Sequence, residues 1–185
     1  GYVATGTVEL CEDEAYQCLW SKHLDWSYYS KPPMIACAQF LGTSLWGDTE
    51  FGVRFFSPVM AAVLSAMLLR WLARERNARV GFSLVLLATA TPLLAVGATL
   101  MTIDSLSVLF WTAAMLAGWR AVQLDSTRLW IWTGVWTGLG FLSKYVGLFQ
   151  WVSWAIFFLG WPAARRQLQR PGPYLAVAIS LLATV

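Results

Sequence analysis

Two short polar segments near the start of the chain contain residue types that can do chemistry on a charged substrate. They are the acidic run at 12–14 and the Lys-Pro-Pro segment at 31–33. A carboxylate such as Asp13 or Glu14 can take a proton from a hydroxyl group or ligate a divalent cation, and Lys31 can hold a phosphate. Each residue also has an ordinary role, because acids stabilise helix starts and a lysine can snorkel toward lipid headgroups. Spacing alone leaves both interpretations open.

Three further charged residues interrupt apolar surroundings. Asp104 lies between two long apolar runs, Lys144 interrupts another, and Arg54 begins the first full apolar segment. An ionisable group near membrane depth is costly, which makes it a functional-site hypothesis by default. Asp104 can instead cap the following helix, and Arg54 can serve as an interfacial anchor. Lys144 can mark a helix break, pair with an acid on the same side, or contact a phosphate.

The composition is that of an integral membrane protein. Of the 185 residues, 58% are hydrophobic and 12% are charged, about half the charged fraction of a soluble domain. A helix needs about 20 apolar residues to cross a bilayer. The apolar segments are 51–72, 80–100, 104–122, 129–143, 145–163 and 173–185. We therefore expect an all-α, polytopic transmembrane bundle of about five to six spans, the last one truncated.

The basic residues predict which side of the membrane each loop faces. Nine of the thirteen Lys and Arg residues lie in one set of alternate loops: Arg70, Arg74, Arg76, Arg79, Arg120, Arg128, Arg165, Arg166 and Arg170. Such residues concentrate on the cytoplasmic side. Residues 1–50 and the turns near Asp104 and Lys144 are therefore predicted to face outward. The net charge of +3 follows from this topology and does not indicate nucleic-acid binding.

We expect two regions, an extracytoplasmic juxtamembrane segment over 1–50 and a transmembrane region over 51–185. The chain begins at Gly1 without an initiating Met or a signal peptide, which we interpret as an internal fragment of a longer protein. In the second region, Gly134 and Gly138 are spaced to let two helices approach closely.

The juxtamembrane segment is predicted to contain two surface helices. Apolar residues recur at helical spacing over 13–24, with Asp13 as the N-cap. Two prolines favour a second helix start, which continues over 34–46 and ends at Gly47. Both helices are too short to cross a bilayer, so they are expected to lie along its surface.

These motifs, taken together, resemble a known family. The segments that carry the resemblance are DEAY at 13–16, KPPM at 31–34, GDTEFGVR at 47–54, TPL at 91–93, TID at 102–104 and GLGFLSKY at 138–145. Their order and spacing resemble those of bacterial membrane glycosyltransferases of the GT-C superfamily, the protein O-mannosyltransferase-like and aminoarabinose-transferase-like enzymes. The resemblance covers nearly the whole chain.

The resemblance implies an enzyme that uses a polyprenyl-phosphate-linked sugar at the extracytoplasmic face of the bacterial inner membrane. It implies that Asp13 is the catalytic carboxylate and that Asp104 contributes to the same cavity. It further implies that Lys31 contacts the lipid phosphate, and Lys144 matches a family lysine. The acceptor is expected to be a lipid, a glycan or a protein outside the cytoplasm.

Three residues complete the substrate-binding set, which also holds Lys31 and Lys144. They are Glu14, Arg54 and Tyr16, the last of which stands where some relatives have a basic residue. Asp13 would activate an acceptor hydroxyl for attack with inversion at the anomeric carbon, and the lysines would stabilise the departing phosphate. If the acceptor is a phosphate, Asp13 would orient it or stabilise positive charge on the sugar. No cofactor is firmly expected, although a divalent metal remains possible.

Two other functions are compatible with the same residues. A transporter or flippase for an anionic lipid or solute would line its pathway with such charges, and a non-catalytic subunit would carry them without using them. The sequence shows no inverted repeat, and the candidate site charges at 13, 14, 31, 104 and 144 are predicted to lie at one membrane face instead of the midplane. These observations favour the glycosyltransferase.

Overall fold

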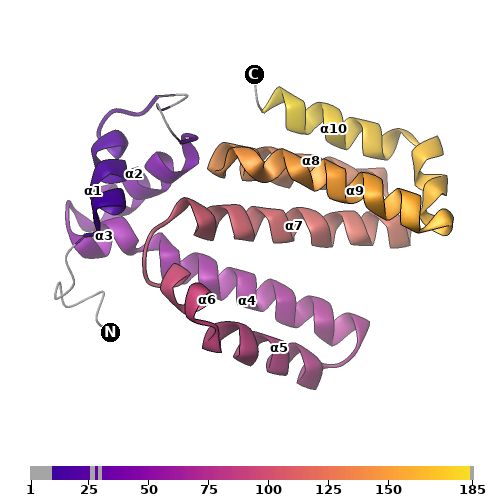
Figure 1. Cartoon of the computed structure of the whole chain (residues 1–185), viewed down its shortest axis with the longest axis horizontal. Coiled ribbons are helices and arrows are strands. Elements are labelled where there is room, and N and C mark those ends of the chain that lie inside the picture. The colour runs from indigo at the N-terminus through magenta and orange to yellow at the C-terminus, as the bar shows by residue number, and fades with distance from the viewer. Residues whose placement is uncertain (1–9, 26–27, 29–30, 184–185) are drawn as a thin grey trace. The chain divides into compact units, whose positions relative to one another are not determined.

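The computed structural model describes residues 10–25, 28 and 31–183. All regular structure within these residues is helical (Figure 1), which confirms the predicted all-α fold. The chain divides into two compact units, 1–109 and 110–185. The long helix α7 (Ile103–Leu124) begins in the first unit and continues into the second.

Three short helices open the first unit. They are α1 (Glu12–Ser21), α2 (Met34–Trp46) and α3 (Glu50–Arg54). The helix expected over 34–46 is confirmed. It ends at Gly47, whose φ of 77° is a left-handed conformation that glycine adopts without steric cost.

The start of α1 differs from the expectation. Asp13 is predicted to be the N-cap, but the helix begins at Glu12 and Cys11 is the N-cap. The carboxylate of Glu14 accepts a 3.2 Å hydrogen bond from the backbone N–H of Cys11, as a glutamate does in a capping box. This bond fixes the helix start before Asp13, so the cap prediction is wrong. Asp13 lies instead in the first helical turn, where a negative charge is still favourable.

Helices α2 and α3 approach each other through glycines. A Cβ atom on Gly42 would lie 2.2 Å from the carbonyl oxygen of Gly52, and one on Gly52 would lie 2.3 Å from that of Gly47. The hydroxyl of Thr49 accepts a 3.1 Å hydrogen bond from the Gly52 N–H and so caps α3. These contacts set α3 firmly against α2, and α3 ends at Arg54.

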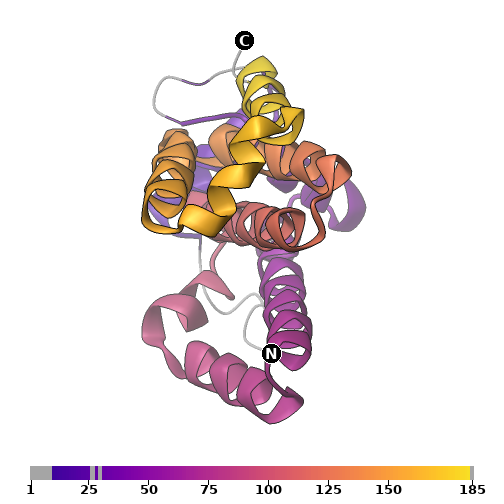
Figure 2. The same ribbon diagram turned by 90° about the vertical axis from the view of Figure 1, so that its right-hand side faces the viewer.

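The rest of the first unit consists of α4 (Phe56–Glu75), α5 (Ala78–Ala90), α6 (Pro92–Gly97) and the start of α7. Helices α4 and α5 lie side by side, and Figure 2 shows the chain changing direction between α5 and α6. The apolar stretch expected over 80–100 is therefore broken into two helices. The cause is Pro92, which disfavours helical backbone at the residue before it.

Two helical stretches, Glu50–Glu75 and Ile103–Leu124, are long and apolar enough to cross a membrane. Tyr145–Gly160 with Pro162–Gln169, a pair bent by 118°, would add a third if it forms one span. The described residues thus form an all-α membrane helical bundle. The division at residue 50 and the five to six spans stay predictions.

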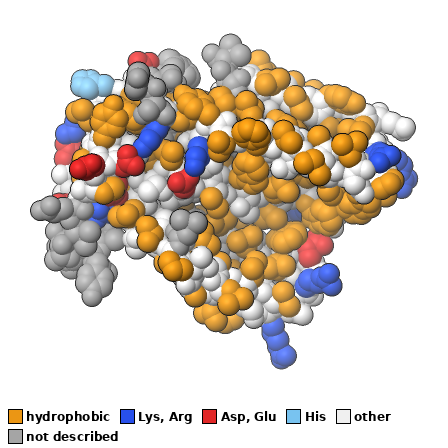
Figure 3. Space-filling view, viewed as in Figure 1, with side chains coloured by type: hydrophobic (Ala, Val, Ile, Leu, Met, Phe, Trp, Pro, Cys, Tyr) orange, Lys and Arg blue, Asp and Glu red, His pale blue; other side chains and the backbone are white. Residues whose placement is uncertain are grey.

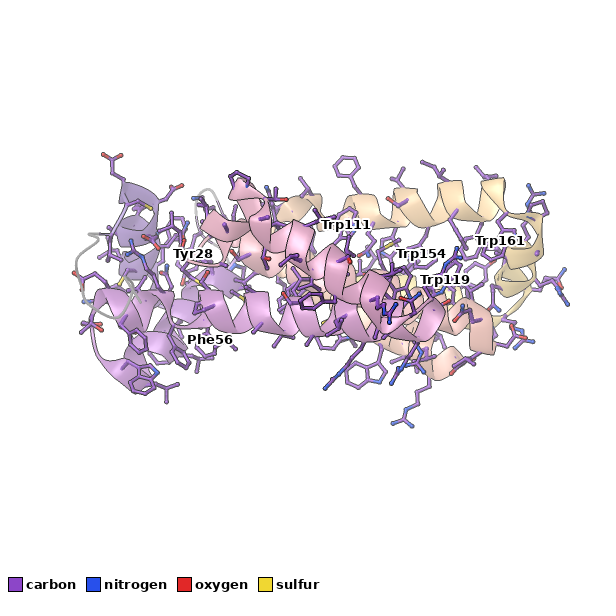
Figure 4. All side chains as sticks on the ribbon, turned by 90° about the horizontal axis from the view of Figure 1, so that it is seen from below. Tyr28, Phe56, Trp111, Trp119, Trp154 and Trp161 are labelled. Carbon is purple, nitrogen blue, oxygen red and sulfur yellow. The ribbon has the colours of Figure 1, made fainter. Side chains whose placement is uncertain are left out.

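The second unit contains α8 (Thr127–Ser143), the 3-10 helix η2 (Tyr145–Leu148), α9 (Phe149–Gly160), the 3-10 helix η3 (Pro162–Gln169) and α10 (Pro171–Leu182). Its core combines large aromatic side chains with alanines. The members of that core are Ala121, Trp130, Trp154, Phe158, Ala164 and Ala176. Beside them, Trp119 stacks on Trp161 with ring centroids 5.7 Å apart (Figure 4).

Helices α8 and α10 pack closely through the two glycines that the sequence singled out. A Cβ atom on Gly134 would lie 2.5 Å from the carbonyl oxygen of Ala176, and one on Gly138 would lie 2.8 Å from the Cβ of Ala183. The prediction that this pair of glycines permits close helix approach is confirmed.

Adding one methyl group at this contact should destabilise the second unit. We expect Gly134→Ala to lower the free energy of unfolding by about 1–3 kcal/mol, because the backbone of α10 would have to move away. Gly160→Ala is the matched control, since a Cβ there meets nothing within 4 Å. The measurement is thermal unfolding of the full-length protein in detergent. Equal unfolding midpoints for the two variants would contradict the packing argument.

Candidate functional site

A fully buried ion pair lies at the centre of the α1–α3 region. Glu14 is 0% exposed and Arg54 is 1% exposed. The Nη2 atom of Arg54 donates to Oε2 of Glu14 at 2.6 Å, and its Nε atom lies 2.9 Å from Oε1 and 3.2 Å from Oε2. Such a two-pronged contact fixes both side chains in orientation as well as in distance.

Backbone amides complete the environment of the same carboxylate. Glu14 accepts hydrogen bonds from the N–H of Met101 at 3.0 Å and from that of Cys11 at 3.2 Å. Burial by itself would raise the pKa of Glu14, but the bonds from Arg54 and the two amides outweigh burial and hold that pKa below its ordinary value. Glu14 is therefore a carboxylate at neutral pH.

The turn before α7 is held against the start of α4. The buried hydroxyl of Ser57 lies 2.7 Å from the carbonyl oxygen of Gly97 and 2.9 Å from that of Leu100. Ser105 donates to the same Gly97 oxygen at 2.8 Å. Because Asp104 is the second residue of α7, these bonds anchor the backbone that carries it. The Asp104 side chain itself is exposed.

The two polar motifs near the chain start come into direct contact. Lys31 Nζ donates to Asp13 Oδ1 at 3.1 Å. The Asp13 side chain is 74% exposed, whereas that of Lys31 is only 19% exposed. A carboxylate open to solvent thus lies beside a lysine whose side chain is largely sheltered. Figure 3 shows acidic and basic side chains close together where α1 and α2 lie.

Three aromatic rings, two of them on α1, contact one another in the same unit. Tyr16 contacts Trp20 at a centroid distance of 4.5 Å, and Trp20 stacks on Tyr28 at 4.9 Å. The hydroxyl of Tyr28 bonds the carbonyl oxygens of Trp20 and His23 at 3.1 and 2.9 Å. Tyr16, whose ring is tilted against that of Trp20, is half exposed and therefore accessible to a ligand.

Lys144 belongs to the second unit. Its extended backbone, with φ −156° and ψ 127°, separates α8 from η2, and its N–H donates to the carbonyl oxygen of Gly140 at 2.9 Å. The helix break, one of the three alternatives that the sequence left open for Lys144, is confirmed. The convergence of Lys144 with Asp13 and Asp104 stays a prediction.

The sequence reasoning missed several polar residues of the first unit's interior. Gln17 and Gln39 are buried on α1 and α2, and Ser57 and the Met101 amide take part in the network described above. Glu14 and Gln17, three residues apart, lie on one helical face. That spacing was a usable signal, whereas the role of Met101 depends on the fold alone. The described residues contain no group of three or more His, Cys, Asp or Glu side chains placed to hold a metal ion.

The family model and three known proteins that match this chain are all named as glycosyltransferases. The family model for dolichyl-phosphate-mannose-protein mannosyltransferases matches residues 30–185. Lipid A galacturonosyltransferase RgtD of Rhizobium johnstonii is 34% identical over 83% of this chain and 33% of its own length. Two undecaprenyl phosphate-alpha-4-amino-4-deoxy-L-arabinose arabinosyl transferases are also similar. The Edwardsiella ictaluri enzyme is 34% identical over 76% of this chain and 26% of its own length. The Pseudomonas savastanoi enzyme is 33% identical over 83% of this chain and 30% of its own length.

The chain therefore spans between a quarter and a third of the length of these relatives. No solved structure matches it significantly. The family model covers most of the chain, including the Lys-Pro-Pro segment and every helix from α2 to α10. The chain belongs to the dolichyl-phosphate-mannose-protein mannosyltransferase family of GT-C membrane glycosyltransferases.

Proposed function

We propose that the protein transfers a sugar from a polyprenyl-phosphate-linked donor to an acceptor at the extracytoplasmic face of the membrane. The observation that carries the proposal is the contact between Asp13 and Lys31, which joins a carboxylate to a phosphate-binding type of side chain across 18 residues of sequence. The family membership supports the reaction type, and the relatives named for undecaprenyl phosphate sugars support the donor class.

We assign one side chain to the acceptor and the other to the leaving phosphate. The acceptor oxygen attacks the anomeric carbon while the bond from that carbon to the phosphate oxygen breaks, which inverts the configuration. Asp13 takes the proton from an acceptor hydroxyl, since its carboxylate is open to solvent. Lys31 stabilises the negative charge that develops on the departing polyprenyl phosphate. The products are the glycosylated acceptor and polyprenyl phosphate.

Asp104 and Lys144, which the sequence also predicts to be site residues, are part of this proposal. Asp104, at the start of α7, and Lys144, at the end of α8, would contribute from the same face of the membrane. We place that face toward the periplasm, with the protein in the inner membrane. A lipid acceptor is the first to test, because one relative is named for lipid A.

The test is a transfer assay with the full-length protein in sealed membrane vesicles. The probes are radiolabelled undecaprenyl-phosphate sugars, with the lipid fraction of the vesicles as acceptor. We expect the label to move covalently into an acceptor lipid and unlabelled polyprenyl phosphate to accumulate. Label that crosses the membrane while still attached to its donor would support a transporter and contradict the proposal. Folded protein that transfers none of the offered sugars to lipid, glycan or protein would also contradict it.

The same assay tests the role of Lys31. We expect Lys31→Met to raise the KM for the donor by roughly 10–100-fold, because a hydrogen bond to a charged group contributes about 1.5–3 kcal/mol. The matched control is Lys22→Met, which removes an exposed lysine that pairs with Asp48 at 3.0 Å. That variant should keep a wild-type donor KM. A donor KM equal in both variants would remove Lys31 from phosphate binding.

A further inference from the structure

We propose that Glu14 and Arg54 are positioning residues. Their buried ion pair fixes the backbone that carries Asp13 relative to the backbone that carries Asp104. The proposal rests on the proposed function, in which these two aspartates act on one substrate. It differs from the expectation from the sequence, where Glu14 and Arg54 bind the substrate themselves.

Burial separates Glu14 from its neighbour Asp13. The two residues are adjacent on α1, yet Glu14 is 0% exposed and the Asp13 side chain is 74% exposed. Successive residues on an α-helix point about 100° apart, so one side chain can face the interior while the next faces solvent. Both oxygens of the Glu14 carboxylate accept hydrogen bonds from protein donors. These bonds fix the first turn of α1, and with it the backbone of Asp13.

Arg54 is a rigid partner for this carboxylate. It ends α3, which is capped by Thr49 and held against α2 by the close approach of Gly42 and Gly52. The guanidinium group meets Glu14 through two of its nitrogen atoms at 2.6–3.2 Å. A planar fork of this kind restricts the angle of approach as well as the distance, which a lysine would not do. The first turn of α1 is thus held in a defined orientation.

The third part of the arrangement is the turn that leads into α7. The Met101 N–H donates to Glu14 at 3.0 Å, and Ser57, three residues after Arg54, holds the carbonyl oxygens of Gly97 and Leu100. Asp104 follows Met101 by three residues. One buried glutamate therefore connects α1, the end of α3 and the turn that leads into α7, which are far apart in the sequence.

The relative position of Asp13 and Asp104 should affect the rate of sugar transfer more than the affinity for the donor. A misplacement of reacting groups by about 1 Å can cost about 100-fold in rate, even when the change lies away from the chemistry. A change in the Glu14–Arg54 geometry should therefore lower kcat and leave donor binding nearly unchanged.

The experiment uses variants that keep both charges and alter only the geometry. Arg54→Lys loses the fork, and Glu14→Asp shortens the carboxylate arm by one methylene. In the full-length protein we expect each to lower kcat by about 10–100-fold with a donor KM within about twofold of wild type. Arg54→Met should lose more activity than Arg54→Lys. Lys22→Arg, which alters an exposed ion pair at the other end of α1, is the matched control and should retain kcat.

Hydrogen exchange supplies a readout that does not depend on activity. The Met101 amide should exchange faster in Glu14→Asp and Arg54→Lys than in wild type, while the amides of α4 keep their protection. A donor KM that rises as much as kcat falls would assign the pair to substrate binding and overturn the proposal. Unchanged Met101 exchange would overturn it as well. If the wild-type protein transfers no sugar, the proposed function fails, whereas the exchange comparison still decides whether the pair holds the two segments together.

Discussion

Asp13→Asn is expected to lower kcat for sugar transfer to a hydroxyl acceptor by about 10²–10⁴-fold, the usual contribution of a general base. The amide has nearly the same size as the carboxylate but cannot take up the proton. The fold should survive, because Asp13 is largely exposed and exposed ion pairs contribute at most about 1 kcal/mol to stability. The measurement is the initial transfer rate in membranes that contain matched amounts of wild-type and variant protein.

Asp48→Asn is the control for this prediction. Asp48 is also an exposed acid that pairs with a lysine, at 3.0 Å from Lys22, but it lies in the loop between α2 and α3. Its variant should transfer sugar at the wild-type rate. Undiminished transfer by Asp13→Asn would remove Asp13 from its proposed role. Loss with a hydroxyl acceptor but not with a phosphate acceptor would assign Asp13 specifically to proton removal.

The elements of the fold were largely predictable because they depend on local patterns. The second juxtamembrane helix ends where a glycine follows it, and the contact between α8 and α10 follows from the spacing of Gly134 and Gly138. The errors are local as well. Hydropathy merged α5 and α6 because Pro92 is a single residue in an apolar run. The sequence pattern predicts Asp13 as the N-cap because it does not show that the Glu14 carboxylate accepts a hydrogen bond from the Cys11 N–H.

The partners within the candidate site were much less predictable. Motif order and basic-residue topology predict that Asp13, Lys31 and Asp104 lie on one membrane face. Arg54, the ion-pair partner of Glu14, lies 40 residues away from it in the sequence, and the Met101 amide lies 87 residues away. Neither follows from periodicity or composition, since both require the packing of helices that are distant in the chain. Burial then separates two neighbouring acids that look alike in the sequence.

Breaking the buried pair on one side should have the largest effect on stability. We expect Arg54→Met to destabilise the full-length protein by about 3–5 kcal/mol at neutral pH, because it leaves the Glu14 carboxylate buried without its counter-charge. The double variant Glu14→Gln/Arg54→Met should recover part of this loss, since no charge remains in the interior. The measurement is a double-mutant cycle of unfolding free energies in detergent. Additive single effects would show that the two side chains do not stabilise each other.

The pH dependence of stability gives an independent check of this prediction, because acid should act in opposite directions on the contribution of Glu14 in wild type and in Arg54→Met. In the wild-type protein the pKa of Glu14 is lowered, so the stabilisation is fully present above the pKa of an unfolded glutamate, about 4.3. It is lost as the pH falls through the lowered folded-state pKa. In Arg54→Met, burial acts without the guanidinium and should raise the pKa of Glu14, so protonation relieves the buried charge. The gap in stability between wild type and Arg54→Met should therefore narrow by several kcal/mol as the medium becomes acidic, whereas the gap for Lys22→Met, which removes an exposed ion pair, should stay within about 1 kcal/mol at every pH. A constant gap down to the lowered pKa would show that Glu14 is not the charge on which the cost of Arg54→Met depends.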